Sequence, residues 1–190
     1  MSRLQKKRPE ELTPEQREQF DRIARFRKPD ADGQIGGPFD PWIRSPEVAK
    51  RAVSLGNFIW ERTTLDRRIV ELAIIITARH FRSNVEWVAH ARMAREQGVS
   101  DDVIDAVFAR RRPQDAPADE LLSYDVVTAL HESHDLPLDL YRQAVEAFGE
   151  QGLMELIVTI GFYGFVSLTL NAFNVPVAAG ADTPFPREGE

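Results

Sequence analysis

The amino-acid sequence predicts an all-α fold, and three observations support this prediction. Apolar residues recur at the spacing of three and four that places them on one face of a helix. A capping residue followed by proline, a common start of a helix, occurs at Thr13-Pro14 and again at Ser45-Pro46. The β-branched residues lie inside helical patterns, with no hairpin turn between alternating runs. We therefore expect a bundle of about eight helices with short connections.

Residues 1–40 are predicted to be an N-terminal arm with a short helix over 15–26 and a loop rich in glycine and proline. Thr13 should cap this helix, and the loop can be ordered if Phe39 and Trp42 pack on the core. Ser45 then begins a helix that continues to about residue 61.

Three further helices are predicted over 65–81, 85–97 and 103–110. Apolar residues nearly encircle the first of these, so we expect it to be central in the bundle. Ser83 or Asn84 should cap the second, and Gly98 should end it. Ser100 should cap the third.

The remaining helices are predicted over 119–133, 138–148 and 153–173. The last of these could reach membrane-spanning length, but Glu155 and several small polar residues favour a buried core helix. The letters ELIV at 155–158 resemble ELAI at 71–74, which indicates duplicated two-helix units. Residues 177–190 should form an irregular tail.

The composition is that of one globular domain and bears on several classes of function. The chain has 190 residues, of which 43% are hydrophobic and 28% charged. A net charge of −6 gives no reason to expect binding to nucleic acid or to an anionic membrane. The absence of cysteine excludes disulfides, thiolate metal sites and a thiol nucleophile. We expect a cytoplasmic protein, since no signal-peptide pattern follows the basic N-terminus.

Three side chains that can exchange protons, Glu71, Glu86 and His90, lie within two of the central helical patterns. Glu86 and His90 are four residues apart, so they share one helix face and can pass a proton or hold a bound group. Glu71 directly precedes an apolar run, where a carboxylate must be paired or its pKa shifts. Such an arrangement is also how acid–base sites are built, and Trp87 could wall a pocket there.

Each of these assignments has an alternative. Glu86 and His90 also match an ordinary exposed helical pair, and Glu71 could form a salt bridge with Arg67 or Arg68 one turn earlier. Glu71, Glu86 and His90 could instead bind a metal, as in a metal-dependent oxidoreductase, although the Glu-x-x-His spacing typical of helical bundles is absent. No cofactor-binding motif is present, so we expect neither a cofactor nor a metal.

The remaining histidines and one run of arginines are predicted to be structural. His80 should gain from the dipole at the end of its helix, and His131 and His134 should be solvated residues near a helix end. Residues 110–112, three consecutive arginines, should form a solvated turn or contact a partner subunit.

The segment 71–107, ELAIIITARHFRSNVEWVAHARMAREQGVSDDVIDAV, resembles the carboxymuconolactone decarboxylase family, which includes the alkylhydroperoxidase D-like proteins. The resemblance extends over about residues 40–176, so we place the main domain at 41–176. It implies an alkylhydroperoxidase D-like bundle of helical hairpins that assembles as a trimer or hexamer. It also implies a site between helices, near a subunit interface.

The resemblance further implies which chemistry is retained. The alkylhydroperoxidase branch uses two cysteines with a glutamate and a histidine, and Ser83 and Glu86 stand at the cysteine positions here. Thiol peroxidase activity should therefore be absent. The decarboxylase branch, which releases CO₂ from a carboxylated lactone, needs no cysteine. It implies His90 as the proton donor, with Glu71 and Glu86 orienting it.

Together these inferences predict a cofactor-independent enzyme that acts on a small carboxylated organic acid by decarboxylation, proton transfer or a lactone reaction. Arg79 or Arg82 could neutralise the substrate carboxylate, with Ser83 and Trp87 lining the site. The alternative is a non-catalytic oligomeric scaffold or small-molecule-binding protein of the same fold.

Overall fold

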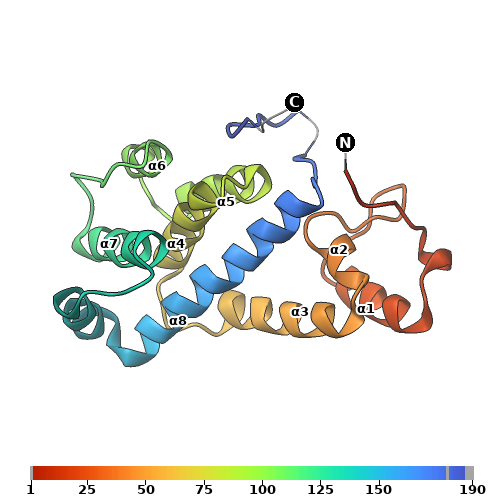
Figure 1. Ribbon diagram of the computed structural model, residues 1–190, viewed down its shortest axis with the longest axis horizontal. Coiled ribbons are helices and arrows are strands. Elements are labelled where there is room, and N and C mark those ends of the chain that lie inside the picture. The colour runs from red at the N-terminus through yellow and green to blue at the C-terminus, as the bar shows by residue number, and fades with distance from the viewer. Residues whose placement is uncertain (1, 179, 187–190) are drawn as a thin grey trace.

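The computed structural model describes residues 2–178 and 180–186, which form eight α-helices, one 3₁₀-helix and no strand (Figure 1). This confirms the all-α prediction. In chain order the elements are η1 (Pro9–Glu11), α1 (Pro14–Ala24), α2 (Phe39–Ile43), α3 (Pro46–Glu61), α4 (Arg67–His80), α5 (Asn84–Glu96), α6 (Asp101–Phe108), α7 (Ala118–Glu132) and α8 (Leu138–Ala172).

Two elements differ from the sequence prediction. The short helix α2 lies where only a loop and two docking aromatic residues were expected. The predicted helices 138–148 and 153–173 follow one another directly within α8, where Gly149 alone departs from helical geometry with φ of 70°. Glycine adopts this left-handed conformation without the Cβ clash of other residues, so the chain changes direction there without a loop.

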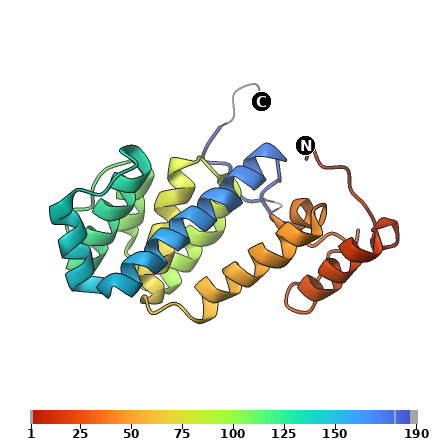
Figure 2. The ribbon, with the colours of Figure 1, turned by 60° about the horizontal axis from the view of Figure 1, so that its bottom comes forward.

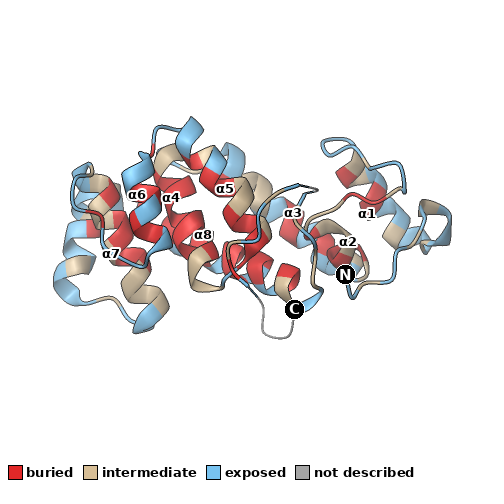
Figure 3. Cartoon of the chain, turned by 90° about the horizontal axis from the view of Figure 1, so that it is seen from above, coloured by how far each residue is buried: buried red, intermediate tan, exposed pale blue. Residues whose placement is uncertain are grey.

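The central helix of the bundle is α4, as its apolar sequence predicts. It packs against α5, α6, α7 and α8, while α8 crosses it at the middle of the elongated molecule (Figures 1 and 2). Burial is concentrated along α4 and the inner side of α8 (Figure 3). Helix α8 is long and apolar enough to cross a membrane, but 67% of its most apolar window is buried against other helices. It is therefore packed as the core helix that the sequence favoured.

The N-terminal arm lies at one end of the molecule and α6 and α7 at the other (Figure 1). Trp42 of α2 joins the arm to the bundle, because its ring stacks on Phe165 with 5.3 Å between centroids and its N–H donates to Thr169. The backbone N–H of Arg3 donates to the carbonyl of Phe173 at the end of α8. The expected docking of Phe39 and Trp42 on the core is confirmed.

Two of the predicted caps form and two do not. The side chains of Thr13 and Ser100 accept hydrogen bonds from the first turns of α1 and α6. Ser45 and Ser83 stand at the N-cap positions of α3 and α5 as predicted, but neither side chain makes a capping hydrogen bond. Asn84 does not cap α5 either, since its side chain is bonded instead to residue 185 in the C-terminal segment.

Candidate functional site

The α4–α5 hairpin brings Glu71, Glu86 and His90 together between α4 and α5. Gly98, with φ of 95°, ends α5 as predicted. All three side chains are buried, with 1%, 6% and 6% of their surfaces exposed in the order given. Buried ionisable groups need partners, and here they are partners of one another.

His90 lies between the two carboxylates. Its Nδ1 is 2.7 Å from Oε2 of Glu71 and makes a hydrogen bond to it. Its Nε2 is 3.3 Å from Oε2 of Glu86, a charge contact that lacks the geometry of a hydrogen bond. That oxygen of Glu86 is buried and has no hydrogen-bond partner among the described residues. One side of the imidazole is therefore fully engaged, and the other faces an unsatisfied acceptor.

The charges around His90 decide its protonation. Burial disfavours the imidazolium, but the hydrogen bond to Glu71 and the adjacent Glu86 carboxylate outweigh burial and raise the pKa of His90 to about 9. Burial would likewise raise the pKa of Glu71, but His90 and Arg67 lower it. At neutral pH the site therefore holds an imidazolium between carboxylates.

Arg67 extends this network toward the surface. Its guanidinium donates to the second oxygen of Glu71, so both oxygens of that carboxylate are bonded. The salt bridge considered for Glu71 as an alternative is thus present in addition to the contact with His90. Trp60, at the end of α3, lies over the guanidinium at 3.6 Å from its ring centroid and is 47% exposed. Trp60 is the most exposed residue of the network.

Tyr163 of α8 packs edge to face against the ring of His90, with 5.0 Å between the ring centroids. Its hydroxyl accepts a hydrogen bond from the indole N–H of Trp60 at 3.2 Å. Burial and the two nearby carboxylates raise the pKa of Tyr163, so the phenol stays neutral. Sequence reasoning missed both aromatic residues. The polar hydroxyl of Tyr163 within an apolar run was the one available signal.

The other predicted site residues lie in different surroundings. Trp87 packs against Phe108 and Phe185, in contacts that do not include the Glu71–His90 pair. Arg79 donates to the carbonyl of Phe108, and Arg82 donates to the carbonyl of Pro186. Ser83 is fully buried beside α5, and its hydroxyl has no hydrogen-bond partner among the described residues.

The histidines outside this site correct two expectations. His131 is not a solvated cap: its ring stacks on His80 with 4.5 Å between centroids, and its Nε2 is 2.9 Å from the hydroxyl of Thr77. Burial and the neighbouring His80 lower the pKa of His131 to about 4. Burial and Arg110 also lower the pKa of His80, so this residue is not the dipole-stabilised cation that was expected.

Glu155, the counterpart of Glu71 in the proposed repeat, has a structural role. Its carboxylate accepts hydrogen bonds from Thr63, Thr64 and Gln151, and so fixes the turn between α3 and α4. Among residues 2–178 and 180–186, no group of three or more histidine, aspartate and glutamate side chains is arranged to hold a metal ion.

Comparisons with known proteins agree with this fold. The crystal structure of a protein of unknown function from Agrobacterium tumefaciens, suggested to be the antioxidant defence protein AhpD, is similar with a TM-score of 0.64. The similarity covers 72% of this chain and 94% of that chain at 18% identity, and so concerns the fold. No curated protein matches.

Residues 46–121 match the carboxymuconolactone decarboxylase family. This segment runs from the start of α3 into α7 and contains Trp60, Arg67, Glu71, Glu86 and His90, whereas Tyr163 lies outside it. The similarity of this cysteine-free chain to the carboxymuconolactone decarboxylase family is thus found over residues 46–121, which hold all of the network except Tyr163.

Proposed function

We propose that the protein is an acid–base enzyme that protonates a small carboxylated organic acid, with decarboxylation as the reaction that the site suits best. The observation that carries the proposal is the position of His90 between two carboxylates, with its Nε2 facing an unsatisfied oxygen of Glu86. A pKa of about 9 keeps this imidazole protonated at neutral pH, as a general acid requires.

The proton would come from Nε2. When the bond between carbon and the carboxylate group breaks, CO₂ leaves and the electron pair stays on the substrate carbon. The Nε2–H of His90 then protonates that carbon, while Nδ1–H keeps its hydrogen bond to Glu71. Glu71 thus fixes the ring and stabilises its charge, and the Glu86 carboxylate, 3.3 Å from Nε2, adds to that stabilisation. Water afterwards returns a proton to His90.

A carboxylated substrate also needs a cation, and Arg67 is the one in this network. Arg79 and Arg82 are bonded to backbone carbonyls elsewhere, so the proposal moves this role to Arg67. Trp60 covers Arg67 and is itself half exposed, which makes movement of Trp60 the natural way for substrate to enter. Arginine suits this task because its planar group binds a carboxylate through two hydrogen bonds.

The test is a turnover screen with carboxylated lactones and β-keto acids, following CO₂ release and deuterium incorporation from heavy water. The wild type should turn over at least one of them, and His90→Gln should be slower by about 100-fold or more while keeping its helical circular dichroism. Arg112→Ala, a surface change far along the sequence, is the control and should match the wild type. Equal rates in wild type and His90→Gln would contradict the proposal.

The burial of the site favours a second candidate function. Because Glu71 is already partnered by His90 and Arg67, and the three acid–base side chains are buried, the same geometry serves a binding or scaffold protein in which the charges only stabilise the fold. That function predicts no exchange of deuterium into any compound of the screen, and a His90→Gln variant that loses stability alone.

We also propose that the protein self-associates through the outer face of α8. This helix has no charged side chain from residue 156 to residue 172, yet Ile157, Phe165 and Leu168 are exposed there. A second copy is the occupant that the proposal names, because the same face carries Met154 near one end and so repeats apolar residues along its length. Light scattering at micromolar concentration should show an oligomer, and Leu168→Glu should dissociate it; a monomeric wild type would refute this.

A further inference from the structure

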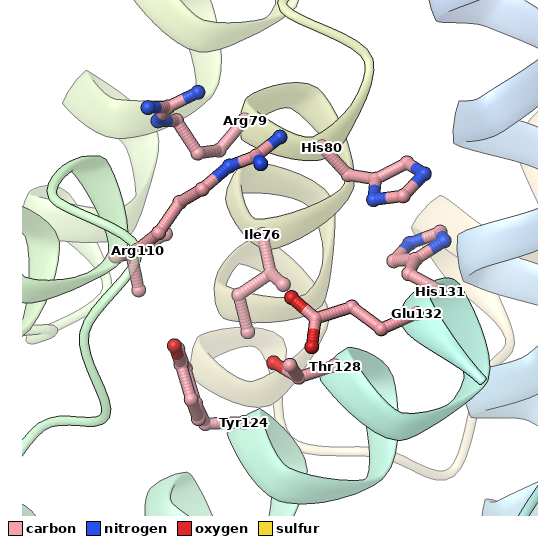
Figure 4. A pocket seen from close by; sticks show the side chains of 9 residues that line it. Ile76, Arg79, His80, Arg110, Tyr124, Thr128, His131 and Glu132 are labelled. Atoms are coloured by element: carbon pink, nitrogen blue, oxygen red, sulfur yellow. The ribbon is translucent and has the colours of Figure 1, made fainter.

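A second cluster of chemically active side chains lies apart from Glu71, Glu86 and His90, where α4, α6 and α7 end (Figure 4). It surrounds a small, open pocket with a volume of about 30 Å³. This is well below the range for drug-sized ligands, so a ligand here must be a small ion or molecule. The polar lining residues are Arg79, His80, Arg110, Tyr124, Thr128, His131 and Glu132.

We propose that this pocket binds a small oxyanion that carries a hydroxyl group, such as a hydroxycarboxylate or the monoanion of phosphate. The guanidinium groups of Arg79 and Arg110 would bind the oxyanion, and Glu132 would accept a hydrogen bond from the hydroxyl. The proposal does not depend on the function proposed above, because none of its residues belongs to the Glu71–His90 network.

The first support is the pairing of the arginines. Eight arginines of this acidic chain form salt bridges with carboxylates, and Arg112 is one of them through Asp125. Arg79 and Arg110 do not form one with any described residue. The Arg79 guanidinium contacts a backbone carbonyl and aromatic faces, and Arg110 is exposed, with no hydrogen bond from its guanidinium among the described contacts. Both arginines line the pocket, and neither guanidinium forms a salt bridge with Glu132 or with another described carboxylate.

The second support is the mutual repulsion at this place. Burial lowers the pKa of Arg79, and the charges of Arg110 and Arg82 lower it further. Burial and Arg110 act in the same way on His80. Bringing like charges together costs free energy, which a bound anion would recover. Arg110 lowers the pKa of both Arg79 and His80, so its charge lies close to both side chains.

The third support is the backbone conformation just beyond the ends of the helices. Within the part of the chain that the structure describes, four residues other than glycine have positive φ, and three of them are Arg82, Arg110 and His134, each just beyond the end of a helix. Glycine is the usual residue at such a position. Helix dipoles favour basic residues there, and Arg79 does bind the end of α6 through the carbonyl of Phe108. Arg110 has no such carbonyl partner, so its charge is available to a ligand.

Glu132 sets the selectivity of the pocket. Its carboxylate points toward Thr128 and the space above Ile76 in Figure 4, on the side of the pocket across from the arginines. An anionic ligand that has no hydrogen-bond donor would be repelled by the Glu132 carboxylate. A hydroxyl next to the oxyanion turns the same carboxylate into a hydrogen-bond acceptor.

The hydrogen bonds around His131 define its tautomer in the empty pocket. The hydroxyl of Thr77 donates to the carbonyl of Ala73, so it can only accept from Nε2 of His131. His131 is therefore a neutral imidazole with its proton on Nε2, and its Nδ1 has a free lone pair. The ring signals of His80 and His131 are consequently sensitive reporters of an anion arriving beside them.

The experiment is a titration of the full-length protein with glycolate, acetate and inorganic phosphate, followed by the imidazole carbon–proton signals in NMR. Glycolate or phosphate should shift the signals of His80 and His131 saturably and leave those of His90 unmoved. Acetate, which lacks the hydroxyl, should bind at least fivefold more weakly than glycolate. The ratio of glycolate to phosphate affinity identifies which source of the oxyanion fits.

Matched variants complete the test. Arg110→Ala should weaken binding at least tenfold, whereas Arg112→Ala, two residues away and paired with Asp125, should leave it within twofold. Glu132→Gln should reduce the preference for glycolate over acetate. Because Arg110 is exposed, its removal should not unfold the protein, and circular dichroism verifies this. Binding that does not saturate, or equal affinities in Arg110→Ala and Arg112→Ala, would overturn the proposal.

Discussion

Two histidines of this bundle, His90 and His131, each donate a hydrogen bond to a side chain of α4, yet their pKa values are shifted in opposite directions. His90 lies between two carboxylates, and its pKa rises to about 9. His131 bonds a hydroxyl and stacks on another histidine, and its pKa falls to about 4. Burial disfavours the charged form of both rings, so the difference lies in the partners.

The comparison teaches that burial alone does not assign a role to a histidine in a helical bundle. At His90, Glu71 and Glu86 supply enough negative charge to stabilise a buried cation. At His131, the neighbouring His80 and His134 supply none, and the ring remains a neutral hydrogen-bonding group. The first half of α4, with Glu71, is thus suited to stabilising a protonated histidine, and its C-terminal end, with Arg79, to binding an anion.

The largest expected effect comes from removing the carboxylate that makes His90 different. Glu71→Ala leaves His90 and Arg67 buried without their shared partner, so the free energy of unfolding should fall by about 3 to 5 kcal/mol. Urea denaturation measures this. The matched control is Glu47→Ala, which removes an exposed pair with Arg51 and should lower the stability far less. Equal losses in the two variants would mean that the buried network stabilises the fold no more than an exposed ion pair does.

The second prediction concerns alkaline pH. The folded pKa of His90 is raised to about 9 from about 6.5, so its contribution is complete below pH 6.5 and is lost as the pH rises through 9. The loss should be about 3 kcal/mol at most, from the size of the shift. Denaturation curves from pH 6 to pH 10 should show this slope in the wild type. The stability of His90→Gln should not change with pH over the same window. If that variant keeps the slope of the wild type, another group causes the pH dependence.

The third prediction is the opposite slope on the acid side. The folded pKa of His131 is depressed to about 4, so its contribution is complete above pH 6.5 and is lost as the pH falls through 4. His131→Gln keeps a group that can bond Thr77 but cannot take up a proton, and should lessen the decline in stability between pH 6.5 and pH 4. A decline as steep as in the wild type would show that carboxylates alone cause it.

The smallest expected effect comes from Trp60, the aromatic residue that lies over Arg67. Trp60→Phe removes the N–H that donates to Tyr163 but keeps an aromatic face over Arg67. The free energy of unfolding should fall by about 1 kcal/mol, the net value of one hydrogen bond. If Trp60 also admits substrate, KM should change more than kcat. A change in kcat alone would place Trp60 in the chemical step.

The sequence predicted those features that depend on neighbouring residues. Spacing of four placed Glu86 beside His90, and the apolar run after Glu71 predicted that this carboxylate is buried and paired. Trp60 and Tyr163 are 103 residues apart, and no local pattern relates α3 to α8. The contact of His131 with Thr77 likewise depends on how α7 packs against α4, a tertiary arrangement that periodicity does not contain.

The anchoring of Phe185 has a consequence for the time course of folding. Asn84 donates to and accepts from the backbone of Phe185, while the ring fills a slot formed by Trp87 and Phe108. These residues are 101 positions apart. At translation rates of about 5 to 20 residues per second, α5 would wait roughly 5 to 20 seconds for this partner on the ribosome. Throughout that interval the nascent chain would present an open aromatic slot, which makes it a target for chaperones before it becomes part of a sealed surface.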